Sequence, residues 1–545
     1  MLSGRHFCFY GNPLKSQRRR VAAAVPRRLR SQRRNGEVSG DEPAHHSKEI
    51  ELKFELDHQD AARVAEHPLL RDSLVPPEER DLSSAYFDTV DFALRKAGVY
   101  LRVRDTGTGY VQTVKSMRSE AEPMERFEWE RQITSPRPEL DHAEGTALAP
   151  VLTPEIKGSL RQLFVTTVKR KTYLVAQGHS EIEVALDQGD VLSGEGRRPI
   201  SEVELELKRG NTTDLFSLAR SLAEALPLRL AVKTKAERGY ELVEGGTHDV
   251  EKATDIDIKP DMTSEEAFRA IAHNCLRQII ANAPATCRGL PEALHQMRIG
   301  LRRLRAALAI FDDIVADEQQ GRIRAELKWV TQHLGPARDL DVFATDVLRP
   351  QREARPGDEN IAAALRDMEE KRAAAYARVA ESLRSERFRT VVIDVVEWVE
   401  AGLWATGGDE FRKELRTRPI AELAKKELRH LRKTIKKRGA NLRHKSVRQR
   451  HKLRIRAKRL RYGTEFFAGT FDGHTSEKRR SDSLSALKDL QDALGGLNDI
   501  ATRQTLIEHG VEHGRASSEE QAAKLLHNAE EAFSRFIDTK AFWKA

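Results

Sequence analysis

The chain has 545 residues and is 39% hydrophobic, which is enough for several domains with cores of their own and argues against wholesale disorder. It contains no apolar run approaching the roughly 20 residues of a membrane-spanning helix, so neither a span nor a membrane partner is expected. The three cysteines form no CxxC pair, which argues against a zinc ribbon or disulfide scaffold and suits a reducing cytoplasm. The net charge of +9 is moderate, so its distribution matters more than its size.

The N-terminal segment is strongly basic. Residues 1–34 hold ten Lys and Arg residues and no acid. The segment lacks the apolar stretch of a secretory signal and the clear amphipathic helix of a transit peptide. We therefore predict a disordered basic tail over residues 1–46.

Residues 47–245 show the short alternating runs that are typical of β-strands. Gly and Pro residues separate many of the runs, and helical patterns interrupt them at 58–66 and 212–226. The strand-like runs are 49–56, 83–88, 99–104, 110–115, 126–133, 165–175, 181–187 and 202–208. Many antiparallel strands with charges alternating on one face favour a closed barrel.

The first run, KEIELKFEL at residues 48–56, places its apolar side chains on one face and its charged side chains on the other. Acidic faces hold Glu49, Glu51, Asp187, Glu202, Glu204 and Glu206; basic side chains are Lys53, Arg102, Arg104, Lys115, Arg126, Arg170, Lys233 and Lys235. Periodicity alone leaves open that these faces are the solvated outside of the barrel. If they point inward, the carboxylates must be paired or bind metal and the arginines need an anion. A metal-bound polyphosphate would meet both needs.

These motifs also carry a family resemblance. Glu49-Ile-Glu51-Leu-Lys53 resembles the ExExK signature of the CYTH family, the triphosphate tunnel metalloenzymes, and the later motifs, from Tyr86-Phe-Asp88 to the segment Lys235–Tyr240, keep the family order. The resemblance implies an eight-stranded antiparallel barrel that forms a tunnel. It also implies that Mg²⁺ or Mn²⁺ is held by Glu49, Glu51, Glu202 and Glu204, with Glu206 or Asp187 as further candidates.

The same resemblance assigns the remaining tunnel residues. Glu49, Glu51 and Lys53 are the catalytic candidates, and phosphates would be bound by Arg102, Arg104, Lys115, Arg126, Arg170 and Lys235. We interpret Tyr86 and Asp88 as structural. Because no histidine or cysteine is among the candidates, we expect direct attack by water rather than a covalent phospho-enzyme.

A polar linker over residues 246–261 precedes a helical half over 262–540, so the predicted fold class is α+β: a β-barrel tunnel followed by an all-α domain. HQMRIGLRRLR (295–305) and HKLRIRAKRLR (451–461) align without a gap, and related turns follow at 334–343 and 494–501, which indicates a duplicated helical bundle. The shared spacing predicts two helical stripes: His295, Arg298, Arg302 and Arg305, and His451, Arg454, Lys458 and Arg461.

The second stripe lies in a very basic stretch, with eighteen Lys and Arg residues against two acids over 422–461. A polyanion is therefore expected, although the lack of interleaved aromatics and of a helix-turn-helix disfavours nucleic acid. The repeats resemble the CHAD domain, with Arg338-Asp-Leu-Asp341 and Asn498-Asp499 in the expected places, and this resemblance implies that the two stripes bind inorganic polyphosphate.

The predicted function is that of a cytoplasmic, metal-dependent hydrolase that cleaves inorganic triphosphate to diphosphate and phosphate, with a helical domain that binds polyphosphate. Polyphosphate granules are a candidate location within the cytoplasm. Two alternatives stay open: a nucleotide or thiamine triphosphatase, and a non-catalytic polyphosphate-binding adaptor. The sequence leaves open the preferred metal, the oligomeric state and any coupling of the domains.

Overall fold

The computed structural model describes residues 45–48, 50–116, 127–246, 250–471, 473–507 and 515–544. The predicted basic tail lies outside the described residues, except for the start of the first strand, as do Glu49, Arg126 and Cys8. Among the described helices, none combines the length and apolar character needed to cross a membrane.

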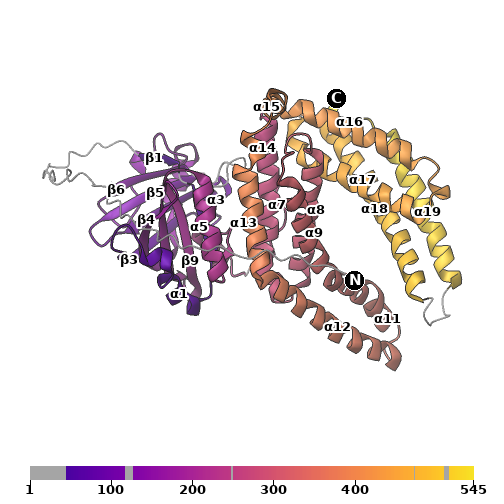
Figure 1. Cartoon of the computed structure of the whole chain (residues 1–545), viewed down its shortest axis with the longest axis horizontal. Helices are drawn as coiled ribbons and strands as arrows, with labels where there is room; N and C mark the ends of the chain where they lie inside the picture. Colours follow the sequence, from indigo (N-terminus) through magenta and orange to yellow (C-terminus); the bar gives the residue numbers. More distant parts are fainter. Residues whose placement is uncertain are drawn as a thin grey trace, which may run out of the picture. The chain divides into compact units, whose positions relative to one another are not determined.

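The N-terminal half is built on an antiparallel sheet of ten strands, which Figure 1 shows in indigo to violet. The sheet order is β1-β6-β5-β4-β3-β7-β8-β9-β2-β10. The strands are β1 His45–Lys48, β2 Glu51–Glu55, β3 Glu78–Asp88, β4 Val99–Asp105, β5 Tyr110–Ser116, β6 Phe127–Ile133, β7 Arg161–Gln177, β8 Ser180–Ser193, β9 Gly196–Arg209 and β10 Arg229–Leu230.

The antiparallel sheet is confirmed, but its strand count differs from the expected eight. β1 precedes the first predicted run of 49–56 and pairs with β6. β2 lies within that run and pairs with β9, and the two-residue β10 extends the edge beside β2. β1 and β10 are the two edge strands of the sheet, and no hydrogen-bonded pairing between them is found among the described residues. Closure of the sheet into a barrel therefore stays a prediction. Because β1 and β2 are separated by only two residues, the chain itself links the β6 and β9 sides of the sheet.

The apolar face of the sheet packs on a helix. Leu52 and Phe54 of β2 are buried together with Phe216 and Leu222 of α5, Thr212–Ala225, which confirms the predicted helix at 212–226. The hairpin between β7 and β8 turns through two residues, and its Gly178 has a φ of 59°, the left-handed conformation that glycine adopts without strain. The remaining short helices are α1 Ala61–Ala65, α2 Pro68–Arg71, α3 Ala93–Lys96, α4 Pro154–Ser159 and α6 Lys235–Val243.

The C-terminal half is helical, as predicted. Its principal helices are α7 Ser264–Cys287, α8 Pro291–Ile310, α9 Gln320–His333, α10 Gly335–Phe343, α12 Glu359–Arg384, α13 Glu386–Ala401, α16 Ile420–Gly439, α17 Val447–Phe466, α18 His474–Ile507 and α19 Arg515–Asp538. The predicted linker packs against α7: Asn282 exchanges hydrogen bonds with the backbone of Glu251, and Ile256 and Ile258 are buried. This segment therefore contributes to the helical core.

Candidate active site and anion-binding cluster

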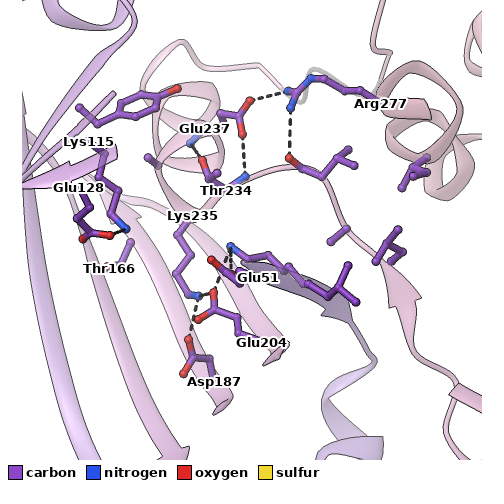
Figure 2. A pocket seen from close by; sticks show the side chains of 18 of the residues that line it. Glu51, Lys115, Glu128, Thr166, Asp187, Glu204, Thr234, Lys235, Glu237 and Arg277 are labelled. Carbon is purple, nitrogen blue, oxygen red and sulfur yellow. Dashed lines mark hydrogen bonds and ion pairs between the residues drawn. The ribbon is translucent and has the colours of Figure 1, made fainter. Parts of the chain in front are cut away.

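A cavity of about 1220 Å³ lies against the charged face of the sheet. Side chains of β2, β4, β5, β7, β8, β9 and α6 line it, together with residues of α7 and α13. Figure 2 shows carboxylates and ammonium groups from several of these elements converging. The charged faces predicted from the sequence therefore point into a cavity, whereas Phe54 and Leu56 of the opposite face are buried in the core.

Three carboxylates form what we call the acidic cluster: Asp187 of β8 and Glu202 and Glu204 of β9. Strand register brings them together, because Asp187 is directly opposite Glu202 and the spacing of two keeps Glu202 and Glu204 on one face. One oxygen from each lies within 4.8 Å of the others. Asp187 and Glu202 are 0% exposed, so their charges require partners inside the protein.

Cationic side chains supply those partners. The Lys235 ammonium, at the start of α6, lies 2.8 Å from Asp187, 2.7 Å from Glu202 and 2.7 Å from Glu204. Arg170 of β7 donates two hydrogen bonds to Asp187, of 2.7 and 2.6 Å, and one of 2.5 Å to Glu204. Lys53 of β2 approaches Glu204 to 3.1 Å.

These contacts keep the cluster ionised. Burial alone would raise the pKa of Glu204, but the charges of Lys235, Lys53 and Arg170 hold that pKa well below its usual value. Burial would likewise lower the pKa of Lys235, whereas Glu202, Glu204 and Asp187 raise it well above its usual value. Each partner thus stabilises the charged form of the other.

The opposite wall of the cavity carries Arg102, Arg104 and Lys115, which we call the basic wall. The Arg102 guanidinium donates to Thr113 at 3.0 Å and to Glu128 at 3.2 Å, and the Lys115 ammonium contacts Glu128 at 2.6 Å. For Arg104 the described part of the chain offers neither a hydrogen-bond nor an ion-pair partner. Repulsion from Arg102, burial and repulsion from Arg170 lower the pKa of Arg104 to about 10, as expected of a cation that faces an anion site.

The acidic cluster fits a hard divalent cation, since its three carboxylates offer oxygen donors at close range. Two of the predicted metal ligands, Glu202 and Glu204, belong to it. Glu51 lines the same cavity but is paired in register with Glu206, and Glu49 lies outside the described residues. Asp187, which the sequence left as an auxiliary candidate, is an equal member of the cluster.

Sequence reasoning missed three residues of the site, two of which, Glu128 and His273, line the cavity. Glu128 is the buried acid that pairs with the basic wall. It follows Arg126 by two residues, and this spacing already indicated that the two side chains lie on the same face of the strand. Arg238, one helical turn after Lys235, is ion-paired with Glu202 and lies 2.6 Å from Glu55. His273 of α7 also lines the cavity, where its Nε2 lies 2.5 Å from Glu400; no sequence motif connected that helix to the tunnel.

The two residues interpreted as structural have structural contacts. The Asp88 carboxylate is 0% exposed and accepts hydrogen bonds from the backbone N–H groups of Leu94 and Arg95 and from the Tyr240 hydroxyl. It therefore caps α3 and ties α6 to β3. The Tyr86 ring stacks on Phe164 at 4.6 Å between centroids, although its side chain also lines the cavity.

In the helical half, four side chains from the two predicted stripes form what we call the helical basic cluster: Arg298 and Arg302 of α8 and Arg454 and Lys458 of α17. Burial and repulsion from Arg454, Arg302, Arg461 and Arg298 lower the pKa of Lys458 to about 7. Since cations of both helices act on one ammonium, the stripes face a common space. Arg305 and His451, at the ends of the stripes, are exposed.

Several donors of this region lack acceptors. Within the described residues, no hydrogen-bond partner is found for the buried Nδ1 of His295 or for the buried Nε atoms of Arg298 and Arg302. The Nε of Arg461 likewise has no hydrogen-bond partner among the described residues, although it lies 3.5 Å from the Glu465 carboxylate of its own helix. Unpaired donors at this density indicate a site for an anion.

The two repeats place glycines equivalently. A Cβ added to Gly335 would lie 3.6 Å from Nη1 of Arg298, and one added to Gly495 would lie 3.0 Å from Nη2 of Arg454. The two stretches predicted as turns are helical, since Gly335 begins α10 and Gly495 lies within α18. In each half, this glycine lets the backbone approach the first arginine of the stripe. The side chains of Asn498 and Asp499, which follow the second glycine, lie outside the described part.

Comparison with known families matches both halves. The model of the CYTH domain matches residues 47–240, and that of the CHAD domain matches residues 270–508. The chain contains a CYTH domain followed by a CHAD domain. The two predicted resemblances are thereby confirmed. The acidic cluster belongs to the CYTH domain and the helical basic cluster to the CHAD domain, while residues of both domains line the cavity.

A curated relative of the CYTH domain is the inorganic triphosphatase of Haemophilus influenzae, 29% identical over 194 residues, which are 35% of this chain and 54% of that protein. The match therefore spans about half the length of the relative. Among solved structures, the CHAD domain from the plant Ricinus communis is 26% identical with a TM-score of 0.43, covering 54% of this chain and 99% of that one. PptA from Streptomyces chartreusis is 17% identical with a TM-score of 0.34, covering 52% of this chain and 100% of that one.

Proposed function

We propose that the CYTH domain is a metal-dependent hydrolase that cleaves inorganic triphosphate to diphosphate and phosphate. The presence of a CYTH domain and the likeness to a protein named inorganic triphosphatase support triphosphate hydrolysis. The observation that carries the proposal is the cavity itself, in which an oxygen-donor cluster faces a wall of cations.

In this proposal, Asp187, Glu202 and Glu204 hold the divalent ion, with Glu49 and Glu51 as the further ligands implied by the sequence. The ion, when bound, neutralises charge on phosphate oxygens and polarises the reacting phosphorus. Mg²⁺ and Mn²⁺ both suit carboxylate ligands.

The chain's own residues then bind and orient the triphosphate. Arg102, Arg104 and Lys115 offer donors to its oxygens, with Arg170, Lys53, Lys235 and Arg126 as the further cations of the predicted set. Water attacks the terminal phosphorus, the bond from that phosphorus to the bridging oxygen breaks, and diphosphate leaves. The low pKa of Glu204 makes it a poor proton acceptor, so its role is to carry charge rather than to act as general base.

The test is phosphate release by the whole protein from inorganic triphosphate, ATP, thiamine triphosphate and long-chain polyphosphate, each with Mg²⁺, Mn²⁺ or excess chelator. We expect the highest kcat/KM on inorganic triphosphate and no turnover with chelator. A cavity of about 1220 Å³ also admits a larger molecule, so comparable kcat/KM on ATP or thiamine triphosphate would replace the substrate assignment. Turnover in excess chelator would contradict the metal assignment.

We also propose that the CHAD domain binds inorganic polyphosphate through the helical basic cluster. A polyphosphate chain repeats one negative charge per unit, which suits several cations facing one space. Acceptor oxygens of the chain would satisfy the unpaired donors of His295, Arg298 and Arg302. The predicted set also includes Arg305, His451 and Arg461. Competition by duplex DNA at equal phosphate concentration would argue for a general polyanion site instead.

One observation favours a second candidate, a non-catalytic adaptor with two anion sites. In the structure every carboxylate of the acidic cluster already contacts a cation of the chain, so the charges of this cluster are compensated by the protein's own side chains. The assay above separates the candidates, because an adaptor would bind triphosphate without releasing phosphate from any of the four substrates.

A further inference from the structure

Lys235, the cation with contacts to all three members of the acidic cluster, is the first residue of α6. A capping box fixes this helix start: the Thr234 hydroxyl accepts a hydrogen bond of 3.1 Å from the backbone N–H of Glu237, and the Glu237 Oε2 accepts one of 2.7 Å from the N–H of Thr234. The direction in which Lys235 leaves the backbone is therefore set by residues 232–237, just before and within the first turn of α6.

A side chain of the CHAD domain binds this segment on both sides of Lys235 (Figure 2). Arg277 of α7 donates through Nη2 to Oε1 of Glu237 at 2.5 Å and through Nη1 to the carbonyl of Val232 at 3.2 Å. Its Nε donates to Glu251 at 3.1 Å, which joins the segment between the domains to the same guanidinium. The two Glu237 oxygens are thus divided, one for the helix cap and one for Arg277.

We propose that Arg277 is a positioning residue of the tunnel: it holds residues 232–237 in place and thereby keeps the Lys235 ammonium on the acidic cluster. The CHAD domain would then support triphosphate hydrolysis directly, beside its proposed binding of polyphosphate. A lysine has four rotatable side-chain bonds, so its ammonium stays placed only if its backbone origin is fixed. Displacement of a reacting group by about 1 Å can cost roughly a hundredfold in rate.

The chain offers a matched control for this role. Arg220 of α5 is ion-paired with Glu397 of α13 and lies 3.4 Å from Asp394 of the same helix. This pair also joins a helix of the CYTH domain to one of the CHAD domain, but none of its members lines the tunnel cavity. Arg220→Gln therefore removes a contact between the domains without touching α6.

The first experiment measures the Lys235 ammonium itself, without substrate. The whole protein and its Arg277→Gln, Arg277→Lys, Glu237→Gln and Arg220→Gln variants are treated briefly with acetic anhydride, and acetylation of Lys235 is quantified by peptide mass spectrometry relative to exposed Lys371. We expect Arg277→Gln and Glu237→Gln to raise the relative rate at Lys235 at least threefold, with Arg220→Gln unchanged and Arg277→Lys between. Glu237→Gln keeps a residue that can still form the capping box, so it tests the ion pair alone.

The second experiment rests on the proposed function and measures kcat for triphosphate. We expect a loss of about tenfold in Arg277→Gln, within the range of 10- to 100-fold typical of supporting partners, with less than a twofold loss in Arg220→Gln. In the Arg277→Gln/Glu237→Gln double variant, the loss of kcat should be no greater than in Arg277→Gln alone, because both substitutions break the same ion pair. An inactive wild type would contradict the proposed function but leave the acetylation result to decide on Arg277. If Lys235 is acetylated at the same relative rate in Arg277→Gln and Glu237→Gln as in the wild-type protein, the positioning role is overturned.

Discussion

The acidic cluster of the CYTH domain and the helical basic cluster of the CHAD domain both involve partly buried cations, but among the described residues only the cations of the first form ion pairs. Lys235 and Arg170 are each within 2.8 Å of a carboxylate. In the described part of the chain, no carboxylate lies within ion-pair distance of Arg298, Arg302, Arg454 or Lys458. The first site is balanced and the second is strained by its own repulsion.

This difference predicts opposite costs of substitution. In a balanced site, loss of one charge leaves its partners buried and unpaired, which reduces both activity and stability. In a site of like charges, loss of one charge weakens anion binding but relieves repulsion in the free protein. An anionic ligand must also act differently in each site. In the tunnel it replaces existing ion pairs, whereas in the helical basic cluster it supplies the negative charge that offsets the repulsion between the cations.

The largest expected effect is on tunnel chemistry. Glu204→Gln keeps the side-chain size but removes a charge that Lys53, Arg170 and Lys235 share. We expect kcat for triphosphate to fall about a hundredfold or more, the scale on which a key electrostatic group acts. The control is Glu79→Gln, an exposed acid of β3 paired with Lys171, which should change kcat less than twofold. Equal activity of Glu204→Gln and wild type would remove Glu204 from the site.

The next effect concerns polyphosphate. Substitution of all four residues of the helical basic cluster by Gln should make the slope of log affinity against log salt shallower by about 3, taking roughly 0.7 per charge by analogy with single-stranded nucleic acid. The free variant should melt at a temperature no lower than wild type, because repulsion is relieved. The measurements are titrations of the whole protein at several salt concentrations, and a thermal melt.

A second fourfold variant controls for net charge. It replaces four cations that already have carboxylate partners on exposed surfaces of the CHAD domain, namely Lys371, Arg387, Lys413 and Arg418. Because these side chains face no common space, their loss should leave the salt slope nearly unchanged. Equal slopes in the two variants would show that polyphosphate responds to overall charge rather than to the cluster.

A smaller effect follows from Lys458, whose pKa is lowered to about 7. A bound polyanion favours the charged ammonium and so raises this pKa, which means that binding takes up a proton. Affinity should therefore fall as the pH rises above about 7, by up to tenfold for each unit by which the polymer raises the pKa. Lys458→Arg keeps a charge at all these pH values and should flatten the profile between pH 7 and 9. An unchanged profile would assign the dependence to another group.

Much of the fold followed from local pattern. The period-two alternation around Lys53 distinguished the core face from the charged face, and the repeated stripes beginning at His295 and His451 identified the duplicated bundle. Periodicity could not decide whether a charged face is inside or outside, because that depends on closure of strands distant in sequence. The cavity that the charged side chains of β2, β4, β7 and β9 line supplied that information.

The site was only partly predictable for the same reason. Glu202 and Glu204 were assigned as metal ligands by the family resemblance, whereas Asp187 needed the register of β8 on β9 to become an equal ligand candidate. Arg277 lies in a helix without a basic motif, so no local signal connects it to Lys235. Contacts between distant segments are visible only in three dimensions.

The smallest effect on activity is expected from Tyr240, the partner of Asp88. Asp88 is a buried acid that sharpens the comparison because its hydrogen-bond donors among the described residues are neutral groups rather than cations. Its carboxylate accepts a hydrogen bond of 2.8 Å from the Tyr240 hydroxyl, and burial, together with the Asp88 charge, raises the pKa of that tyrosine. Tyr240→Phe removes one of several donors, so the free energy of unfolding should fall by about 1–2 kcal/mol. The tunnel charges are untouched, so kcat for triphosphate should stay within twofold of wild type. Urea unfolding and the phosphate-release assay check the two values, and a tenfold loss of kcat at unchanged stability would show that Tyr240 acts in the tunnel rather than in the fold.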